Sequence, residues 1–374
     1  MKFTISSSTL NNRLQTLSKV ISSKNSLAIL DCFLFDVSGN QLNITASDNE
    51  NVMKTTVTLD EVEGEGSFCV PNRTILDAMK ELADQPLYFD VNTEDFSIKI
   101  GYQNGVYNFT AQSADAYPRI QSVSDGVTVI TIDASALNDC ISRSLFATAQ
   151  DELRPVMNGL YFDLTPEYLA IVASDGHKLV RNRNFNIKSE VPSSFVMPKK
   201  PASLLRTVLT KDSGDVVIKF DSRSAEIRYQ DGVLSCRLIE GKYPNYNSVI
   251  PEDNPCQLTA DRLSLLGAIR RVLPFATVST QLIRFHIVSG GVEISSEDLE
   301  FNTSAKESVN CEYQGQPMDI GFKGSALTEI FSNLSSDEVT IMLADPSRPG
   351  VVKPSMQPEG GDVLMLIMPM LLND

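Results

Sequence analysis

Histidine is scarce in this chain of 374 residues, which contains only His177 and His286. General-base catalysis and histidine-based metal binding therefore have few candidate residues. The six cysteines are scattered without a C-x-x-C pair, so the sequence predicts neither a metal site nor a disulfide framework. Gly64 and Gly66 are not followed by a glycine at the spacing of a dinucleotide-binding loop, and no P-loop is present. We expect no metal and no other cofactor.

Long apolar runs are also missing. No segment approaches the ~20 apolar residues that a membrane-spanning helix needs. The longest apolar stretch, Val363 to Leu372, is too short and contains Pro369. The first residues alternate like a strand and lack the apolar core of a signal peptide. We expect a cytoplasmic protein with reduced thiols and no membrane partner.

The chain contains a long internal repeat. Leu10, Leu137 and Leu263 each end a similar seven-residue segment. Two further markers recur about 127 residues apart: Ser67-Phe68 as Ser194-Phe195, and Ala46-Ser47-Asp48 as Ala173-Ser174-Asp175. Solenoid units are only ~20–50 residues long, so this repeat is a whole domain. We predict three domains, at residues 1–124, 125–252 and 253–374.

Each copy has the same order of predicted elements: a strand, a helix, several strands, a second helix and more strands. Leu10, Leu14, Leu17 and Ile21 have helical spacing. Alternating runs such as Gln41–Ala46 and Asp215–Phe220 predict antiparallel strands, and linkers are expected near Gln121–Gly126 and Pro251–Pro255. The six predicted helices are Ser8–Ile21, Asn72–Ala83, Ala134–Ala149, Pro198–Lys211, Ala260–Phe275 and Lys323–Leu334. The fold class is α+β.

Charge is unevenly distributed. The net charge of −15 taken alone argues against nucleic-acid binding. The six predicted helices nevertheless carry thirteen basic and only five acidic residues. Basic helices beside an acidic remainder suit a protein that meets a polyanion with its helices. The alternative is that surface helices collect Lys and Arg for solubility.

Four local stretches, together with the repeat, resemble the bacterial beta sliding clamp family, the processivity subunit of DNA polymerase III. They are Met157–Phe162, Ser174–Leu179, Glu240–Tyr246 and Met368–Met370. The resemblance implies three clamp-type domains with antiparallel sheets outside and two helices each inside. It also implies a head-to-tail homodimeric ring around double-stranded DNA, held without sequence preference. Such a clamp is not an enzyme, and it tethers the polymerase, the clamp loader and repair proteins through their short linear motifs.

The resemblance places a partner-peptide pocket at the turn after Ser174 and near the C-terminus. An apolar pocket with adaptable methionines suits peptides that bear Leu or Phe. Without a pocket, the segment after Ser174 would be a polar turn between strands. Met368 and Met370 would then be ordinary core residues. The pocket residues that the resemblance implies are Met157, Ser174, Gly176, His177, Lys178, Leu179, Pro244, Val249, Leu366, Met368, Pro369 and Met370.

Several positions depart from the family pattern. Ser174, Lys178 and Met157 stand where Thr, Arg and Leu are common, and Ser248 and Leu371 stand where the family is associated with Arg. Asn373 and Asp374 extend past the usual end. These departures leave the preferred partner motif open, but not the pocket.

For DNA contact, the resemblance points to basic and polar residues on helices and in loops. Each single lysine could equally be ordinary solvated surface. The candidates are Lys24, Arg73, Gln150, Arg154, Lys199 and Lys200. At the ring interface, Tyr107 and Phe109 of the first domain would meet Val272 and Leu273 of the third, with core packing as the alternative.

Two other functions are compatible with single features of the sequence. Ser174, Asp175 and His177 could suggest a hydrolase, but triad members normally come from distant segments and no G-x-S-x-G elbow is present. A multi-domain scaffold that never touches DNA would keep its function when Lys199 and Lys200 are reversed to Glu.

Overall fold

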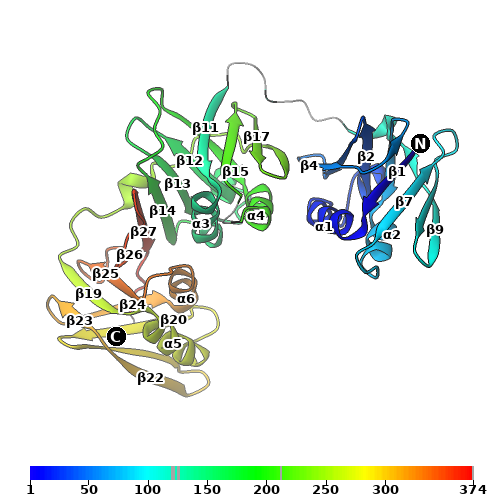
Figure 1. Cartoon of the computed structure of the whole chain (residues 1–374). Coiled ribbons are helices and arrows are strands. Elements are labelled where there is room, and N and C mark those ends of the chain that lie inside the picture. Colours follow the sequence, from blue (N-terminus) through cyan, green and yellow to red (C-terminus); the bar gives the residue numbers. More distant parts are fainter. Residues whose placement is uncertain (119–122, 124–126, 211–212, 373–374) are drawn as a thin grey trace. The chain divides into compact units, whose positions relative to one another are not determined.

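The computed structural model describes residues 1–118, 123, 127–210 and 213–372 (Figure 1). The chain divides into two compact units. The first comprises residues 1–138 and 200–238, and the second comprises residues 139–199 and 239–374. Every pair of strands named below is antiparallel, as predicted from the alternating sequence runs.

The first unit contains two sheets. The five-stranded sheet has the order β5 (Val62–Glu63), β1 (Lys2–Ser6), β7 (Pro86–Val91), β8 (Ser97–Tyr102) and β9 (Gly105–Thr110). The nine-stranded sheet has the order β10 (Gln112–Ser113), β6 (Gly66–Pro71), β2 (Cys32–Ser38), β3 (Gln41–Ser47), β4 (Asn51–Thr58), β18 (Gly232–Arg237), β17 (Ser224–Tyr229), β16 (Asp215–Phe220) and β11 (Thr128–Asp133). It therefore joins strands from two sequence repeats.

The second unit has the same plan. Its nine-stranded sheet has the order β15 (Ser193–Pro198), β12 (Gly159–Leu164), β13 (Leu169–Ser174), β14 (Lys178–Asn184), β27 (Gly361–Ile367), β26 (Gly350–Pro354), β25 (Glu338–Leu343), β19 (Cys256–Asp261) and β23 (Glu312–Gln314). Its four-stranded sheet has the order β22 (Thr303–Asn310), β21 (Gly291–Asp298), β20 (Leu282–Val288) and β24 (Met318–Lys323). This large sheet also crosses from one repeat to the next.

All six predicted helices are confirmed, each somewhat shorter than expected. They are α1 (Ser7–Ser18), α2 (Asn72–Met79), α3 (Ala134–Ser144), α4 (Lys199–Val208), α5 (Arg262–Val272) and α6 (Gly324–Ser332). Short 3-10 turns, Leu145–Ala147 and Leu273–Phe275, take up the predicted ends of α3 and α5. The linker near Pro251–Pro255 has no helix or strand. Lys211 and, apart from Val123, the linker Gln121–Gly126 lie outside the described residues.

The first helix of every repeat begins with the same device. The side chain of Ser6 accepts a hydrogen bond from the main-chain N–H of Thr9, which caps α1. Asp133 accepts from Ala136 at the start of α3, and Asp261 accepts from Ser264 at the start of α5. Each cap satisfies one of the free N–H groups of a helix N-terminus. The three similar segments in the sequence are therefore three strand-to-helix junctions.

A turn also recurs in each repeat. Oδ1 of Asp48 accepts from the N–H groups of residues 50 and 51, and Oδ1 of Asp175 accepts from those of 177 and 178. Oδ1 of Asp298 accepts from those of 300 and 301. An aspartate that bonds to the backbone two residues on stabilises a tight turn. The repeated Ala-Ser-Asp marker is therefore a structural turn in the first two copies, and Asp298 holds its counterpart in the third.

Candidate functional site

The turn between β13 and β14 is closed by its own side chains. Ser174 Oγ donates to the carbonyl of Lys178 at 2.9 Å and accepts from the N–H of Gly176 at 3.1 Å. Gly176 has φ +90°, a left-handed conformation in which a side chain would be strained. The backbone therefore needs both the hydroxyl of Ser174 and the glycine. His177 is exposed and lies on the outside of the turn.

The C-terminal segment lies against this turn. The N–H of Met368 donates to the carbonyl of His177 at 2.8 Å, and the N–H of Met370 donates to the carbonyl of Gly321 at 2.8 Å. Leu366 of β27 pairs with Leu179 of β14 in the sheet. The sequence prediction that these distant segments share one site is consistent with this geometry.

The predicted pocket residues divide into a floor and a rim. Met157, Leu179 and Leu366 are at most 5% exposed, so they would supply the floor of the predicted pocket. Val249 and Met368 are 50% and 38% exposed, so apolar surface is available at the rim. Leu179 and Leu366 share an apolar cluster with Tyr243 and Tyr246, which flank Pro244 in sequence. Tyr243 also stacks on Tyr161 with ring centroids 4.5 Å apart.

Lys178 is the most constrained charge at this site. Its Nζ lies 2.6 Å from Asp175 Oδ2 and 3.2 Å from Glu329 Oε2, a residue of α6. Burial would lower the pKa of Lys178, but the two carboxylates outweigh it and the pKa is raised. Burial would likewise raise the pKa of Asp175, but hydrogen bonds from Lys178 and the backbone lower it. Lys178 is therefore a paired cation and is not free to attract an acidic ligand.

Arg154 belongs beside this turn. A Cβ added to Gly176 would lie 3.5 Å from a guanidinium nitrogen of Arg154. The guanidinium also pairs with Asp151 at 2.8 Å. The sequence analysis grouped Arg154 with the DNA candidates, and it did not single out Asp175 or Glu329 as part of the pocket. The i, i+3 spacing of Asp175 and Lys178 could have predicted their ion pair from the sequence. The contact of Lys178 with Glu329 depends on the tertiary fold.

The DNA candidates differ in their surroundings. Lys24, Arg73, Gln150 and Lys199 are exposed, and no ion pair involves them among the residues that the structure describes. The Lys200 ammonium, in contrast, pairs with Asp48 at 2.5 Å and donates to the carbonyl of Val20 at 2.7 Å. Lys200 is therefore held by the protein itself, contrary to a role as an unpaired phosphate contact.

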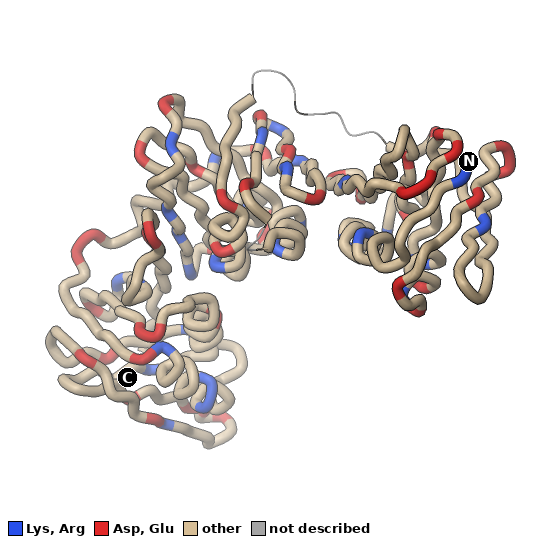
Figure 2. The backbone as a smooth tube through the Cα atoms, viewed as in Figure 1, with Lys and Arg blue, Asp and Glu red and all other residues tan. Residues whose placement is uncertain are grey.

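Part of the positive charge on the helices is already paired with carboxylates. Figure 2 shows Lys and Arg on α1 and α5. On these helices Arg13 pairs with Asp231, Arg262 donates to the carbonyls of Phe331 and Ser336, and Arg271 pairs with Glu307. The sequence count therefore overstates the charge that these helices can offer to a ligand. Arg206 of α4 is exposed without an ion pair in the described part of the chain, and sequence reasoning did not select it.

The residues predicted at the ring interface differ in how much of their surface is exposed. Tyr107 and Phe109 lie on β9, an edge strand of the five-stranded sheet, and are half-buried. Leu273 is half-buried as well, but Val272 is 1% exposed. A residue that is already buried in its own chain has almost no surface left for a partner. Interface contact by Val272 is therefore corrected to core packing.

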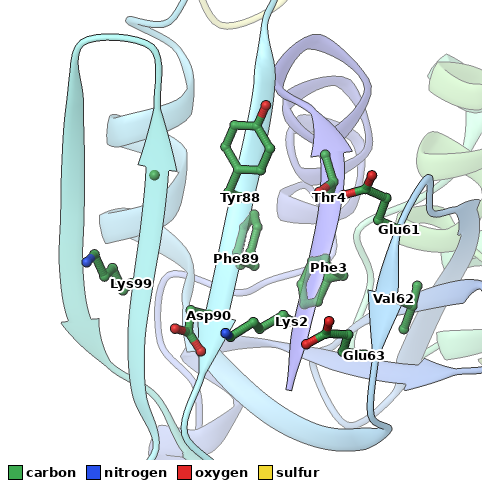
Figure 3. Close-up of a pocket in the computed structure, with 11 residues that line it drawn as sticks. Lys2, Phe3, Thr4, Glu61, Val62, Glu63, Tyr88, Phe89, Asp90 and Lys99 are labelled. Carbon is green, nitrogen blue, oxygen red and sulfur yellow. The ribbon is translucent and has the colours of Figure 1, made fainter.

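A hollow also lies on the solvent-exposed face of the five-stranded sheet. Its lining includes Lys2, Tyr88, Asp90 and Lys99 (Figure 3), and its volume is about 350 Å³. On the opposite face Phe3 and Phe89 stack with centroids 4.6 Å apart. None of the predicted pocket residues lines this hollow. Among the described residues, no His, Cys, Asp and Glu group could hold a metal ion, and no helix is long and apolar enough to cross a membrane.

Comparison with known proteins identifies the family. Residues 1–121, 131–245 and 247–371 match the models of the N-terminal, central and C-terminal domains of the DNA polymerase III beta subunit. The chain is 26% identical to the beta sliding clamp of Pseudomonas aeruginosa over the whole of both chains. It is 27% identical to that of Staphylococcus epidermidis over 99% of each.

Solved structures agree with this assignment. The sliding clamp of Pseudomonas aeruginosa, also solved bound to griselimycin, superposes with a TM-score of 0.93 at 26% identity over all of both chains. The beta subunit of Thermotoga maritima gives 0.89 at 25% identity, again over all of both chains. The chain belongs to the DNA polymerase III beta subunit family, the sliding clamps that act in DNA replication as processivity factors and not as enzymes.

Proposed function

We propose that two copies of this chain join head to tail into a ring that encircles double-stranded DNA. The ring tethers the replicative polymerase, the clamp loader and repair proteins in the cytoplasm. Each chain contributes three domains, at 1–124, 125–252 and 253–374, with helices toward the DNA and sheets outside. Topology holds such a ring on DNA, so its phosphate contacts can be weak and independent of sequence.

The partner site is the surface built by the turn at 174–179 and the C-terminal segment. The carrying observation is the hydrogen bond from Met368 to the carbonyl of His177, which sets exposed Met368 beside the turn. Methionine adapts to several shapes of ligand. An apolar floor beneath an adaptable rim suits short peptides that carry Leu or Phe. A relative solved with griselimycin supports ligand binding by clamps of this family.

The DNA contacts are Lys24, Arg73, Gln150 and Lys199, to which the structure adds Arg206 as a candidate. These side chains are exposed, and none of them is in an ion pair in the described part of the chain. A phosphate can therefore approach them without first displacing a carboxylate. The interface between the two copies uses Tyr107 and Phe109 of one chain and Leu273 of the other.

Imaging of the purified protein, with its mass measured in solution, tests the ring. A closed ring at twice the chain mass is expected. A monomer at every concentration tested would contradict the topological mechanism.

Loading onto nicked circular DNA tests encirclement. The ring should remain on the circle and slide off after the circle is cut. Charge reversal by Arg73→Glu together with Lys199→Glu should shorten retention and leave the ring assembled. Release at the same rate from closed and cut circles would contradict encirclement.

A further inference from the structure

One lysine ties two matched domains together. Lys200, the second residue of α4, lies in the part of the chain that matches the central domain. Its ammonium donates to Asp48 Oδ2 at 2.5 Å and to the carbonyl of Val20 at 2.7 Å. Both acceptors lie in the part that matches the N-terminal domain. Two of the three ammonium donors are therefore used across this junction.

Asp48 is held in place to receive that ammonium. Its Oδ1 accepts from the N–H groups of Glu50 at 3.0 Å and Asn51 at 2.7 Å, and the amide of Asn51 reaches both oxygens. The carboxylate side chain is only 8% exposed. Burial would raise the pKa of Asp48, but the hydrogen bonds from Lys200 and Asn51 outweigh it and lower the pKa. A largely buried carboxylate that stays ionised needs a cation beside it.

The junction carries a second ion pair. Arg13 of α1 places its two terminal nitrogens 3.0 Å from the two oxygens of Asp231. This forked geometry fixes orientation better than a single contact does. Beside it, β4 pairs with β18 from Asn51↔Cys236 to Thr55↔Gly232. A Cβ on Gly232 would lie 2.3 Å from the carbonyl of Lys54, so the glycine permits this close pairing.

The next junction along the chain repeats the arrangement. The turn at Asp175 is the counterpart of the turn at Asp48 in the repeat. There Lys178 pairs with Asp175 and with Glu329 of α6, the second helix of the third repeat. In the first repeat the turn instead meets Lys200 of α4, the second helix of the second repeat. At both junctions, an ion pair therefore joins the recurring turn of one repeat to the second helix of the next repeat.

We infer that Lys200 is a positioning residue which, with Arg13, locks the N-terminal domain onto the central domain, and that holding a DNA phosphate is not its role. The lock holds together, within the first unit, parts of the chain that match two different domains. Its consequence for ring closure rests on the proposed function, but the lock itself does not. Lys199, one residue earlier, is exposed without an ion pair among the described residues and remains a phosphate contact.

Hydrogen exchange of the full-length protein without DNA tests this lock. We expect Lys200→Met and Asp48→Asn each to speed exchange at residues 51–55 and 232–236. The expected factor is about five- to thirty-fold, as for the loss of one or two kcal/mol. The matched control Lys199→Met should leave exchange unchanged and shorten retention on nicked circular DNA. Lys200→Arg keeps the charge and should retain slow exchange. This variant therefore shows whether faster exchange in Lys200→Met comes from loss of the ion pair or from general damage to the fold.

Two results would overturn the inference. One is wild-type exchange in Lys200→Met combined with DNA retention as short as in Lys199→Met, which would make Lys200 a phosphate contact. The other is wild-type exchange in Asp48→Asn. The amide oxygen of Asn can still accept from the N–H groups of Glu50 and Asn51, so faster exchange in that variant reports the lost ion pair with Lys200. If no form of the protein is retained on DNA, the proposed function is contradicted. The exchange rates still show whether Lys200 and Asp48 hold the two domains together.

Discussion

The main-chain N–H of Met368 donates a 2.8 Å hydrogen bond to the carbonyl oxygen of His177, across 191 positions of sequence. The bond extends the pairing of β27 with β14 by one step beyond Ile367. It keeps the C-terminal segment beside the turn and leaves the Met368 side chain 38% exposed. The proposed peptide surface therefore depends on main-chain geometry, and the side chain is free to contact a ligand.

Truncating Met368 should weaken peptide binding without loosening the fold. Met368→Ala removes an exposed apolar contact but keeps the main-chain bond, so we expect a loss of about five- to thirty-fold in affinity. Fluorescence anisotropy with a labelled Leu- and Phe-containing peptide measures it. Leu371→Ala is the control, because Leu371 is 85% exposed just beyond the segment that bonds to the turn. Equal affinities for wild type and Met368→Ala would remove Met368 from the site.

Removing the charge of Lys178 should destabilise the second unit. Lys178→Met leaves Asp175 and Glu329 without their shared cation, and Asp175 is only 21% exposed. We expect a loss of about 1–3 kcal/mol in the free energy of unfolding, measured by urea denaturation. Lys178→Arg should retain most of the stability. If Lys178→Met unfolded at the wild-type urea concentration, the pair would contribute nothing.

The same pair predicts a dependence of stability on pH. The pKa of Asp175 is lowered from its ordinary value of 3.8, so its contribution is present above that value and is lost as pH falls through the lowered pKa. The pKa of Lys178 is raised from 10.5, so its contribution is lost only as pH rises beyond that value. The stability difference between wild type and Asp175→Asn should be constant across neutral pH and shrink in acid below 3.8. A difference that disappeared near pH 7 would contradict this pairing.

Adding a methyl group at Gly232 should damage the junction between β4 and β18. The new Cβ would lie 2.3 Å from the carbonyl of Lys54, so the strands would have to separate. We expect Gly232→Ala to cost about 1–3 kcal/mol, measured by urea denaturation. Gly291→Ala is the control, because its Cβ would meet only the carbonyl of Val309 at 3.6 Å. Equal stability of the two variants would contradict the close approach.

The third copy of the recurring turn predicts part of the proposed interface between chains. Leu299 and Phe301, one and three residues after Asp298, are 83% and 74% exposed. The equivalent turns at Asp48 and Asp175 meet the second helix of the following repeat, so this one should meet α2 of a second chain. Leu299→Glu should raise the dimer dissociation constant about tenfold or more, which is ~1.4 kcal/mol. Analytical ultracentrifugation measures it, with Val191→Glu as an exposed control; unchanged dissociation would place the turn outside the interface.

Local patterns predicted the elements well. The spacing of Leu10, Leu14 and Leu17 predicted α1, and all three residues are at most 1% exposed. Helical spacing and strand alternation are local properties, so one sequence carries them in full. Helix ends were less accurate, because the last turns of α3 and α5 tighten into 3-10 geometry. The alternation of Asp215–Phe220 was likewise sufficient to predict β16.

Pairing between distant charges was beyond sequence reasoning. Lys199 and Lys200 are adjacent and look equivalent, yet only Lys200 meets Asp48. Arg154 was predicted as a DNA contact, and its position near Gly176 could not be read from the sequence. Val272 looked available to a partner, but it packs inside its own chain.

The sequence by itself determined the three repeats, their helices and the strand-to-helix caps, because propensity, periodicity and capping act over a few neighbouring residues. Only the tertiary structure decided which cations are occupied, which apolar residues stay exposed and which turn serves a junction or a pocket. These outcomes depend on side chains brought together from more than a hundred residues apart, such as Lys200 and Asp48. The energy of a charge depends on its neighbours in space, and sequence separation does not report them.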